Sequence, residues 1–149
     1  YHFGSKEALL LAVINERDRR SGSLITDVKP DEGLESLRNL VKIAELNEAN
    51  PGLAMLHTVL QAESFEPDTP AHLYFLERSR VVRRWLEESL VKGQANGTVR
   101  PDLDCGAKAR ELVALLEGAA VVWLMDRETS LVELYRNYIE SFIADAAPR

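Results

Sequence analysis

The sequence holds a single cysteine, Cys105, among 149 residues. One cysteine excludes an internal disulfide and a metal site built from clustered cysteines, and it fits a reducing cytoplasm. Basic residues are also in the minority, since 18 Lys and Arg face 24 Asp and Glu, for a net charge of −6. Proteins that hold DNA usually present a basic face. The charge therefore argues against nucleic-acid binding by the bulk of this chain.

Long apolar runs and enzyme motifs are lacking as well. The most apolar stretch, residues 112–125, is interrupted by Glu117 and is too short to cross a bilayer, so no membrane segment is expected. The histidines His2, His57 and His72 lie on separate segments without metal-ligand spacing. No glycine-rich phosphate loop or nucleophile elbow occurs. We expect a cytoplasmic protein that is not an enzyme and needs no cofactor or metal.

Capping residues and turns divide the chain into about six helices and no convincing strand, which predicts an all-α domain. Ser, Asp or Asn before an apolar stripe is a typical N-cap, and Pro is favoured at the first helical position. The expected helices are 6–20 after Ser5, one from Asp31, 51–64 after Asn50-Pro51, 70–96 after Thr69-Pro70, one from Asp104 to about Asp126, and one from Ser130 to about Ala146.

The last two predicted helices have more apolar surface than a helix needs when it packs a single face against the core of its own domain. Residues 112–125 are apolar all round, and such a helix must be covered all round. Together the two helices could form half of a four-helix bundle with a second copy. The alternative is that both serve the core of one protomer. The residues expected at the homodimer interface are Leu115, Gly118, Ala119, Val122, Leu131, Leu134, Tyr135, Tyr138 and Phe142.

The helix over 51–64 places polar groups on or near an apolar stripe. A polar side chain on an apolar face must find a hydrogen-bond partner. One interpretation is a cavity where such groups orient a small molecule; the other, favoured for His57 taken singly, is a core histidine bonded to a backbone carbonyl. Bulky apolar residues elsewhere could line the cavity or belong to the core. The candidate ligand-binding residues are Met55, His57, Gln61, Glu63, Phe65, Trp85 and Trp123.

The first residues carry the most specific signal. Tyr1-His2-Phe3-Gly4-Ser5-Lys6-Glu7-Ala8-Leu9 resembles the end of the DNA-binding domain in tetracycline-repressor-like (TetR) regulators. In that family an aromatic-His-Phe ends the recognition helix, and a Lys opens the helix that leads into the sensor domain. The rest of the chain is similar to the family in the order and lengths of its helices.

The resemblance implies a domain division and a mechanism. Residues 1–5 would end a helix-turn-helix whose remainder lies upstream, and residues 6–149 would form the ligand-binding and dimerisation domain. Tyr1, His2 and Lys6 would contact operator DNA, mainly its phosphates. A small molecule, expected to be apolar or aromatic because charge is scarce in the expected pocket, would shift the first helix and release a repressor from its operator.

Two other functions stay open from the sequence. One is a small helical enzyme with His57 as acid–base group and Glu63 as its partner. The other is an interaction module whose apolar helix 104–126 docks a different protein. Cys105 follows the cap Asp104 at a helix start, where the pKa of a thiol can fall, so a redox role is a further possibility.

Overall fold

The computed structural model describes residues 4–26 and 30–149, and this part of the chain forms helices and connecting turns without a strand. The expected all-α fold is confirmed. None of the described helices combines the length and apolarity that crossing a bilayer requires. The elements are α1 (Lys6–Thr26), the 3₁₀-helix η1 (Pro30–Asn39), α2 (Leu40–Ala49), α3 (Pro51–Glu63), α4 (Pro70–Ala95), α5 (Cys105–Met125) and α6 (Leu131–Ala146).

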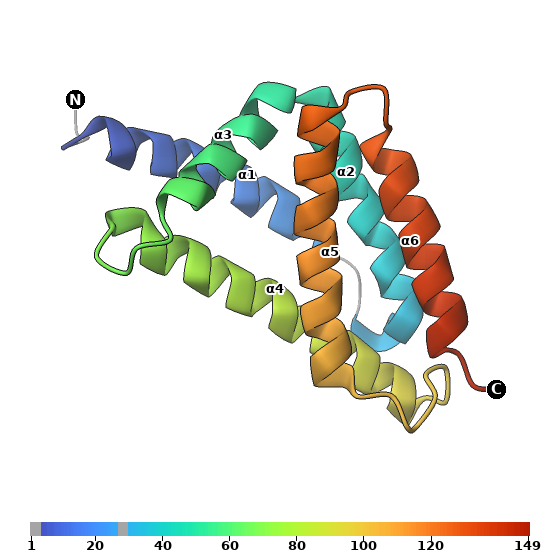
Figure 1. Ribbon diagram of the computed structural model, residues 1–149. Coiled ribbons are helices and arrows are strands. Elements are labelled where there is room, and N and C mark those ends of the chain that lie inside the picture. The colour runs from blue at the N-terminus through green and yellow to red at the C-terminus, as the bar shows by residue number, and fades with distance from the viewer. Residues whose placement is uncertain (1–3, 27–29) are drawn as a thin grey trace.

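The helices form two connected groups. Figure 1 shows α6 beside α2 and α5 at one end of the molecule, whereas α1, α3 and the first half of α4 extend toward the other end. The long helix α4 belongs to both groups, because it packs against η1 and α5 and also against α3. The N-terminal end of α1 and the C-terminus of the chain lie at opposite ends of the molecule (Figure 1).

Local signals set most helix boundaries. Pro51 and Pro70 occupy first helical positions as predicted, but Asn50 and Thr69 provide no side-chain cap. Their side chains instead donate hydrogen bonds backward, to the carbonyls of Leu46 and Glu66. Three further expected caps are confirmed by side-chain oxygens that accept a backbone N–H in the first turn: Ser5 from Ala8 (3.1 Å), Asp104 from Ala107 (3.0 Å) and Ser130 from Glu133 (3.2 Å).

Two expected boundaries are wrong. The first helix does not end at residue 20 as expected but continues to Thr26. The second predicted helix begins as the 3₁₀-helix η1 and is α-helical only from Leu40. Within η1, Gly33 has φ +55° and interrupts the helix with a kink. The side chain of Asp31, the expected cap of that helix, lies outside the described part of the chain.

Two glycines let η1 approach the end of α4 closely. A Cβ on Gly93 would lie 2.3 Å from a methyl of Val99, and one on Gly33 would lie 3.2 Å from the Cα of Gly93. The chain can therefore turn back after α4 and bury Val99 against it. The predicted helix stop at Asn96-Gly97 is confirmed, with Gly97 at φ +79°.

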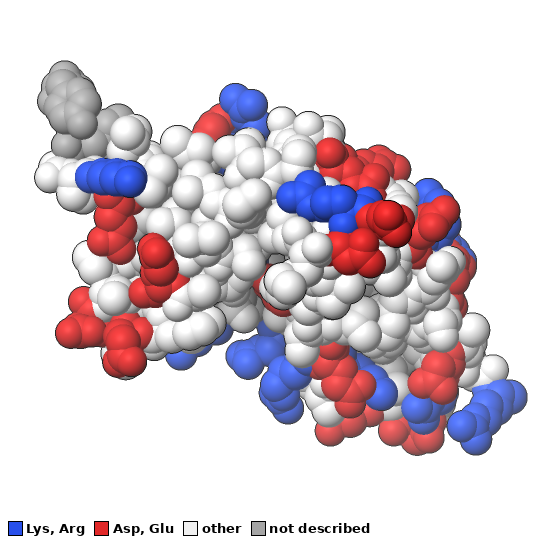
Figure 2. Space-filling view, turned by 45° about the horizontal axis from the view of Figure 1, so that its top comes forward, with Lys and Arg blue, Asp and Glu red and all other residues white. Residues whose placement is uncertain are grey.

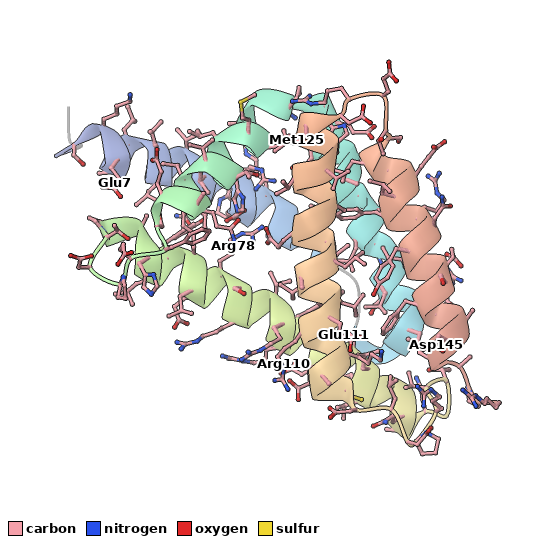
Figure 3. All side chains as sticks on the ribbon, viewed as in Figure 1. Glu7, Arg78, Arg110, Glu111, Met125 and Asp145 are labelled. Carbon is pink, nitrogen blue, oxygen red and sulfur yellow. The ribbon has the colours of Figure 1, made fainter. Side chains whose placement is uncertain are left out.

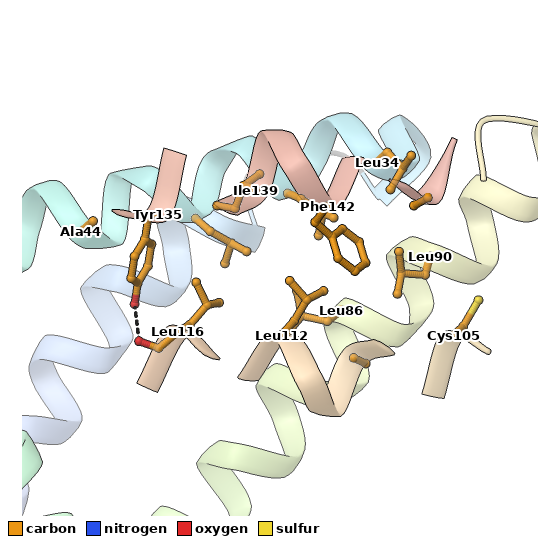
Figure 4. Packing of buried hydrophobic residues seen from close by; sticks show 14 of the residues in the cluster. Leu34, Ala44, Leu86, Leu90, Cys105, Leu112, Leu116, Tyr135, Ile139 and Phe142 are labelled. Carbon is orange, nitrogen blue, oxygen red and sulfur yellow. Dashed lines mark hydrogen bonds between the residues drawn. The ribbon is translucent and has the colours of Figure 1, made fainter. Parts of the chain in front are cut away.

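The apolar core has two separate parts. The larger part joins η1, α2, α4, α5 and α6 around fully buried leucines such as Leu86 and Leu112, as Figure 4 shows. The smaller part joins α1, α3 and α4 through Ile14, Leu60 and Phe75 together with Ala71. Helix α1 is thus attached to the rest of the domain by a small apolar contact.

The residues expected at the dimer interface fall into two classes. Leu115, Gly118 and Val122 are exposed on α5, while Ala119, Leu134 and Tyr138 are half-buried. By contrast, the side chains of Leu131, Tyr135 and Phe142 are at most 7% exposed and lie in the protomer's own core, so their assignment to the interface is corrected. Three-and-four spacing identifies the apolar face of α6, but that face turns inward onto α2 and α5.

Candidate functional site

A cavity of about 720 Å³ lies between the two parts of the core. We call it the central cavity. Residues of all six α-helices contribute to its wall, among them Asp18 of α1, Asn47 of α2, His57 of α3, Arg78 of α4, Glu117 of α5 and Tyr135 of α6. The volume is in the range of pockets that hold small organic molecules, about 300–1,000 Å³. A site formed by six helices can transmit a change in its contents to any of them.

Four charged side chains form an ion-pair chain across the cavity wall. Arg78 of α4 donates from Nε to Asp18 of α1 at 2.8 Å and from Nη1 to Glu117 of α5 at 3.2 Å. Arg17 donates from Nη1 to Asp18 at 3.1 Å and from Nη2 to the amide oxygen of Asn47 in α2. Figure 3 shows Arg78 in the space bordered by α1, α3, α4 and α5. The chain links four helices and carries no net charge.

Asp18 is the centre of this network. Its Oδ1 accepts from Arg17, and its Oδ2 accepts from both Arg78 and the hydroxyl of Tyr74 at 2.6 Å. Only 16% of the Asp18 side chain is exposed. Burial and the bond to Asp18 raise the pKa of Tyr74, so the phenol remains a donor at neutral pH. A single carboxylate thereby holds α1 against two residues of α4.

Burial and neighbouring charges shift the pKa values of the two arginines in opposite directions. Burial opposes the charge on Arg78, but Asp18 and Glu117 outweigh it and raise the pKa of its guanidinium. Burial lowers the pKa of Arg17 despite the adjacent Asp18, and the charge of Arg78 lowers it further. Arginine nevertheless stays protonated in proteins. The cavity therefore contains two permanent positive charges with carboxylate partners.

His57 is the one candidate ligand residue that the structure brings to the central cavity. It is 5% exposed and meets the ring of Phe75 edge-on, with the ring centroids 5.3 Å apart. Its Nε2 is the one buried side-chain nitrogen or oxygen without a hydrogen-bond partner among the described residues, so a bond from that nitrogen to a core carbonyl is not formed. Burial, Arg78 and Arg17 lower the pKa of His57 to about 3, so the imidazole is neutral at physiological pH.

The other candidate ligand residues lie elsewhere. Gln61 is half-buried and lies outside the cavity wall, and Met55, Glu63 and Phe65 are exposed, the last by 73%. Trp85 packs against the larger core, while Trp123 is buried in it beneath the guanidinium of Arg127, 4.4 Å from the ring centroid. Because His57 and Glu63 are six residues apart on a helix, they face different directions, and the hypothesised acid–base pair does not form.

The charged lining contradicts the premise that charge is scarce in the pocket. Sequence reasoning missed Arg17, Asp18 and Arg78 because nothing in α1 or α4 separates them from the surrounding surface charges. One signal was present: Glu117 is the strongly polar residue within the apolar stretch 112–125. A lone carboxylate in such a helix requires a positive partner from another element, and Arg78 is that partner.

The N-terminal candidates are only partly described. Tyr1 and His2 lie outside the described residues, and Lys6 is the exposed first residue of α1. On the face drawn in Figure 2, acidic and basic side chains are intermixed, without a continuous basic surface. That view agrees with the net charge of −6 in assigning no DNA-binding face to this side of the domain.

Cys105 does not have the environment expected of a redox-sensing thiol. Its side chain is 7% exposed, with Sγ 3.8 Å from the carbonyl oxygen of Leu103. Burial and the charges of Asp104 and Glu87 raise the pKa of the thiol, the opposite of the lowering expected at a helix start. Among the described residues, no group of three or more His, Cys, Asp or Glu side chains could hold a metal ion.

Comparison with known proteins gives one match. The sequence model of the family described as "BetI-type transcriptional repressor, C-terminal" matches residues 71–148, which is more than half of the chain and comprises nearly all of α4 together with α5 and α6. No curated protein and no solved structure matches the chain. The matched residues do not include the N-terminal string Tyr1–Leu9, so the family match does not depend on that string.

The Asp18 network predicts that removal of the Asp18 charge strongly lowers the free energy of unfolding. Asp18→Asn would leave Arg17 and Arg78 short of a partner in a mostly buried place, and we expect the free energy of unfolding to fall by about 3 kcal/mol. Glu16→Gln is the matched control, since Glu16 lies on the same helix and also binds two arginines, Arg19 and Arg20, but at the surface. Urea unfolding of both variants measures the difference. Equal losses would show that the network does not hold α1.

His57 predicts a pH dependence of stability. Its pKa is about 3 in the folded chain against an ordinary 6.5, so the unfolded chain binds the proton more tightly between these values. The free energy of unfolding should therefore fall as pH drops below 6.5, by about 1 kcal/mol per pH unit from this residue. Urea unfolding between pH 7 and 5 should show a shallower slope for His57→Phe, whereas His72→Phe should retain it. An unchanged slope in His57→Phe would contradict the buried, neutral imidazole.

Proposed function

The chain belongs to the family of BetI-type transcriptional repressor C-terminal domains, and we propose that it senses a small molecule for a DNA-binding repressor. In this proposal the central cavity holds the ligand. Operator DNA is bound by a helix-turn-helix N-terminal to α1, which residues 1–5 would complete, and residues 6–149 form the sensing and dimerisation domain. Ligand binding releases the repressor from its operator.

The observation that carries the proposal is the position of α1 between two cavities. Asp18 and Gly22 of α1 line the central cavity, and Val13 and Glu16 of the same helix line a second cavity of about 480 Å³ together with residues of α2 and α3. Among the described side chains of α1, Ile14 is the one that is buried. A helix packed this lightly can be moved by what fills the cavity beside it, and its N-terminal end leads toward the DNA-binding segment.

The coupling needed is small. A ligand that prefers one position of α1 over another by about 1–3 kcal/mol changes operator affinity roughly 5- to 150-fold. The loss of one charge-assisted hydrogen bond in the Asp18 network is of that size, about 1.5–3 kcal/mol. Displacement of α1 in two joined protomers would change the spacing of their recognition helices, which must match successive major grooves. Tyr1, His2 and Lys6 would then hold or lose phosphate contacts.

We propose the exposed apolar face of α5 as the dimer interface. Leu115, Val121, Val122 and Met125 are 37–85% exposed there, beside Gly118, where an added Cβ would meet no atom within 4 Å. We assign Leu134 and Tyr138 of α6, which are half-buried, to the same interface. Exposed apolar side chains gathered on one helix are typical of a protein–protein contact, and a second α5 fits against small residues at close distance.

This interface predicts a change in oligomeric state. Wild-type chain should scatter light with twice the 16.7 kDa of one copy, and Val122→Glu should reduce that mass to a single copy because it places a charge in the apolar contact. Val59→Glu is the control, since Val59 is similarly exposed, 46% against 53%, but lies on α3. A dimer in the Val122→Glu variant, or a monomeric wild type, would contradict the interface.

The sensing proposal is tested with the complete protein and its operator. Compounds that raise the melting temperature are added to the protein–operator complex, and we expect those that bind the central cavity to weaken operator binding 5-fold or more. Ala120→Phe fills part of the cavity wall and should remove both effects while operator binding without compound persists. Ala95→Phe, exposed at the end of α4 and outside both cavities, should change neither. A compound that binds the cavity and leaves operator affinity unchanged would contradict the proposal.

A further inference from the structure

The central cavity offers unused hydrogen-bond donors. Arg78 binds carboxylates through Nε and Nη1, and within the described residues its Nη2 has no partner. Arg17 binds through Nη1 and Nη2, and its Nε likewise has none among those residues. A guanidinium carries five N–H donors in a fixed plane that suits the two oxygens of a carboxylate. Both arginines can therefore donate a hydrogen bond to a further anionic oxygen while they keep their bonds to Asp18.

The strongest acceptor of the network is already occupied. Both oxygens of Asp18 accept, one from Arg17 and the other from Arg78 and Tyr74. A cationic ligand would have to displace one of these donors from a side chain that is 16% exposed. The arrangement thus favours a ligand that brings acceptor oxygens over one that brings a positive charge.

His57 extends the donor set into the buried part of the wall. Its Nε2 is buried without a partner among the described residues, which destabilises the protein unless a ligand or water supplies one. The imidazole remains neutral because burial and the charges of Arg78 and Arg17 oppose its protonation. In the tautomer with hydrogen on Nε2, His57 can donate to an oxygen of a bound molecule.

Glu117 is the member of the network that a ligand can most easily displace from Arg78. Its side chain is 37% exposed, compared with 16% for Asp18, and its described bond to Arg78 is a single contact at 3.2 Å. If an incoming carboxylate took the place of Glu117 on Arg78, Glu117 could turn to solvent, and the cavity would keep two positive and two negative charges. Exchange of one carboxylate for another avoids the cost of an unbalanced buried charge.

We propose that the central cavity binds an organic carboxylate, whose oxygens accept from Arg78, Arg17 and His57 while its apolar part lies along Leu73, Val81 and Val113. This assignment rests on the proposed sensing function, because it names the ligand class for the same cavity. It adds a carboxylate to the small apolar or aromatic ligand expected from the sequence. The exchange also provides a signal, since it breaks the Arg78–Glu117 link between α4 and α5 next to the Asp18 contact with α1.

Calorimetric titration of the 149-residue chain with matched probes tests the charge preference. The probes are 3-phenylpropionate, 3-phenylpropionamide and 3-phenylpropylamine, and a second set of octanoate, octanamide and octylamine. We expect at least one acid to bind about tenfold more tightly than its amide, because the amide lacks the charge that a guanidinium recognises. Neither amine should bind. Tighter or equal binding of an amide or an amine would overturn the carboxylate assignment but leave the cavity as a ligand site.

Substitutions of the network residues test where the acid binds. Arg78→Lys keeps the charge but loses the planar pair of donors, and we expect it to weaken acid binding by about tenfold or more. Glu117→Gln removes the competing carboxylate and should tighten binding several-fold, a gain that no loss of folding can imitate. Arg80→Lys, exposed on the same helix and paired with Glu77, should change nothing. Unchanged affinity in both Arg78→Lys and Glu117→Gln, or the absence of binding by both acids, would overturn the proposal.

Discussion

The carboxylate of Asp18 is the contact on which the position of α1 depends. It binds Arg17, Arg78 and Tyr74 at once, and through Arg78 it is linked to Glu117 on α5. Apolar burial would not replace it, because the small core part below α1 contains one buried side chain of that helix, Ile14. Charge-assisted hydrogen bonds are strong when partly buried and are lost completely when one partner moves. The hydrogen bonds of Asp18 therefore hold α1 strongly while they are intact, and α1 is released when they break.

The cavity and this network are consequences of the same packing. The two parts of the core do not meet across the middle of the domain, and the space of about 720 Å³ between them is bounded by helices from both. Polar side chains line this space because water or a ligand can reach them, whereas buried residues such as Leu86 and Leu112 pack where neither can. The larger core holds α2, α5 and α6 together, and in the proposed function the network is the part that would respond to the contents of the cavity.

Features that depend on a few adjacent residues were predictable from the sequence, and features that depend on distant residues were not. The caps at Ser5, Asp104 and Ser130, the helix starts at Pro51 and Pro70 and the stop at Gly97 are decided locally, and they yielded the order and lengths of most helices. The cavity joins Arg17, Arg78 and Glu117, which are up to 100 positions apart, and no local pattern pairs them. Burial was misjudged for the same reason: the apolar stripe of α6 showed which residues share a face, but not that the face packs inside the protomer.

The central claim is that the contents of the cavity set the position of α1. The most direct measurement is the distance between spin labels on Ala8 of α1 and Arg136 of α6, both exposed, in a Cys105→Ala background and with the second protomer left unlabelled. The account predicts that a saturating amount of a compound bound in the cavity shifts this distance distribution, and that Ala120→Phe prevents the shift. An unchanged distribution with the cavity occupied would contradict the claim.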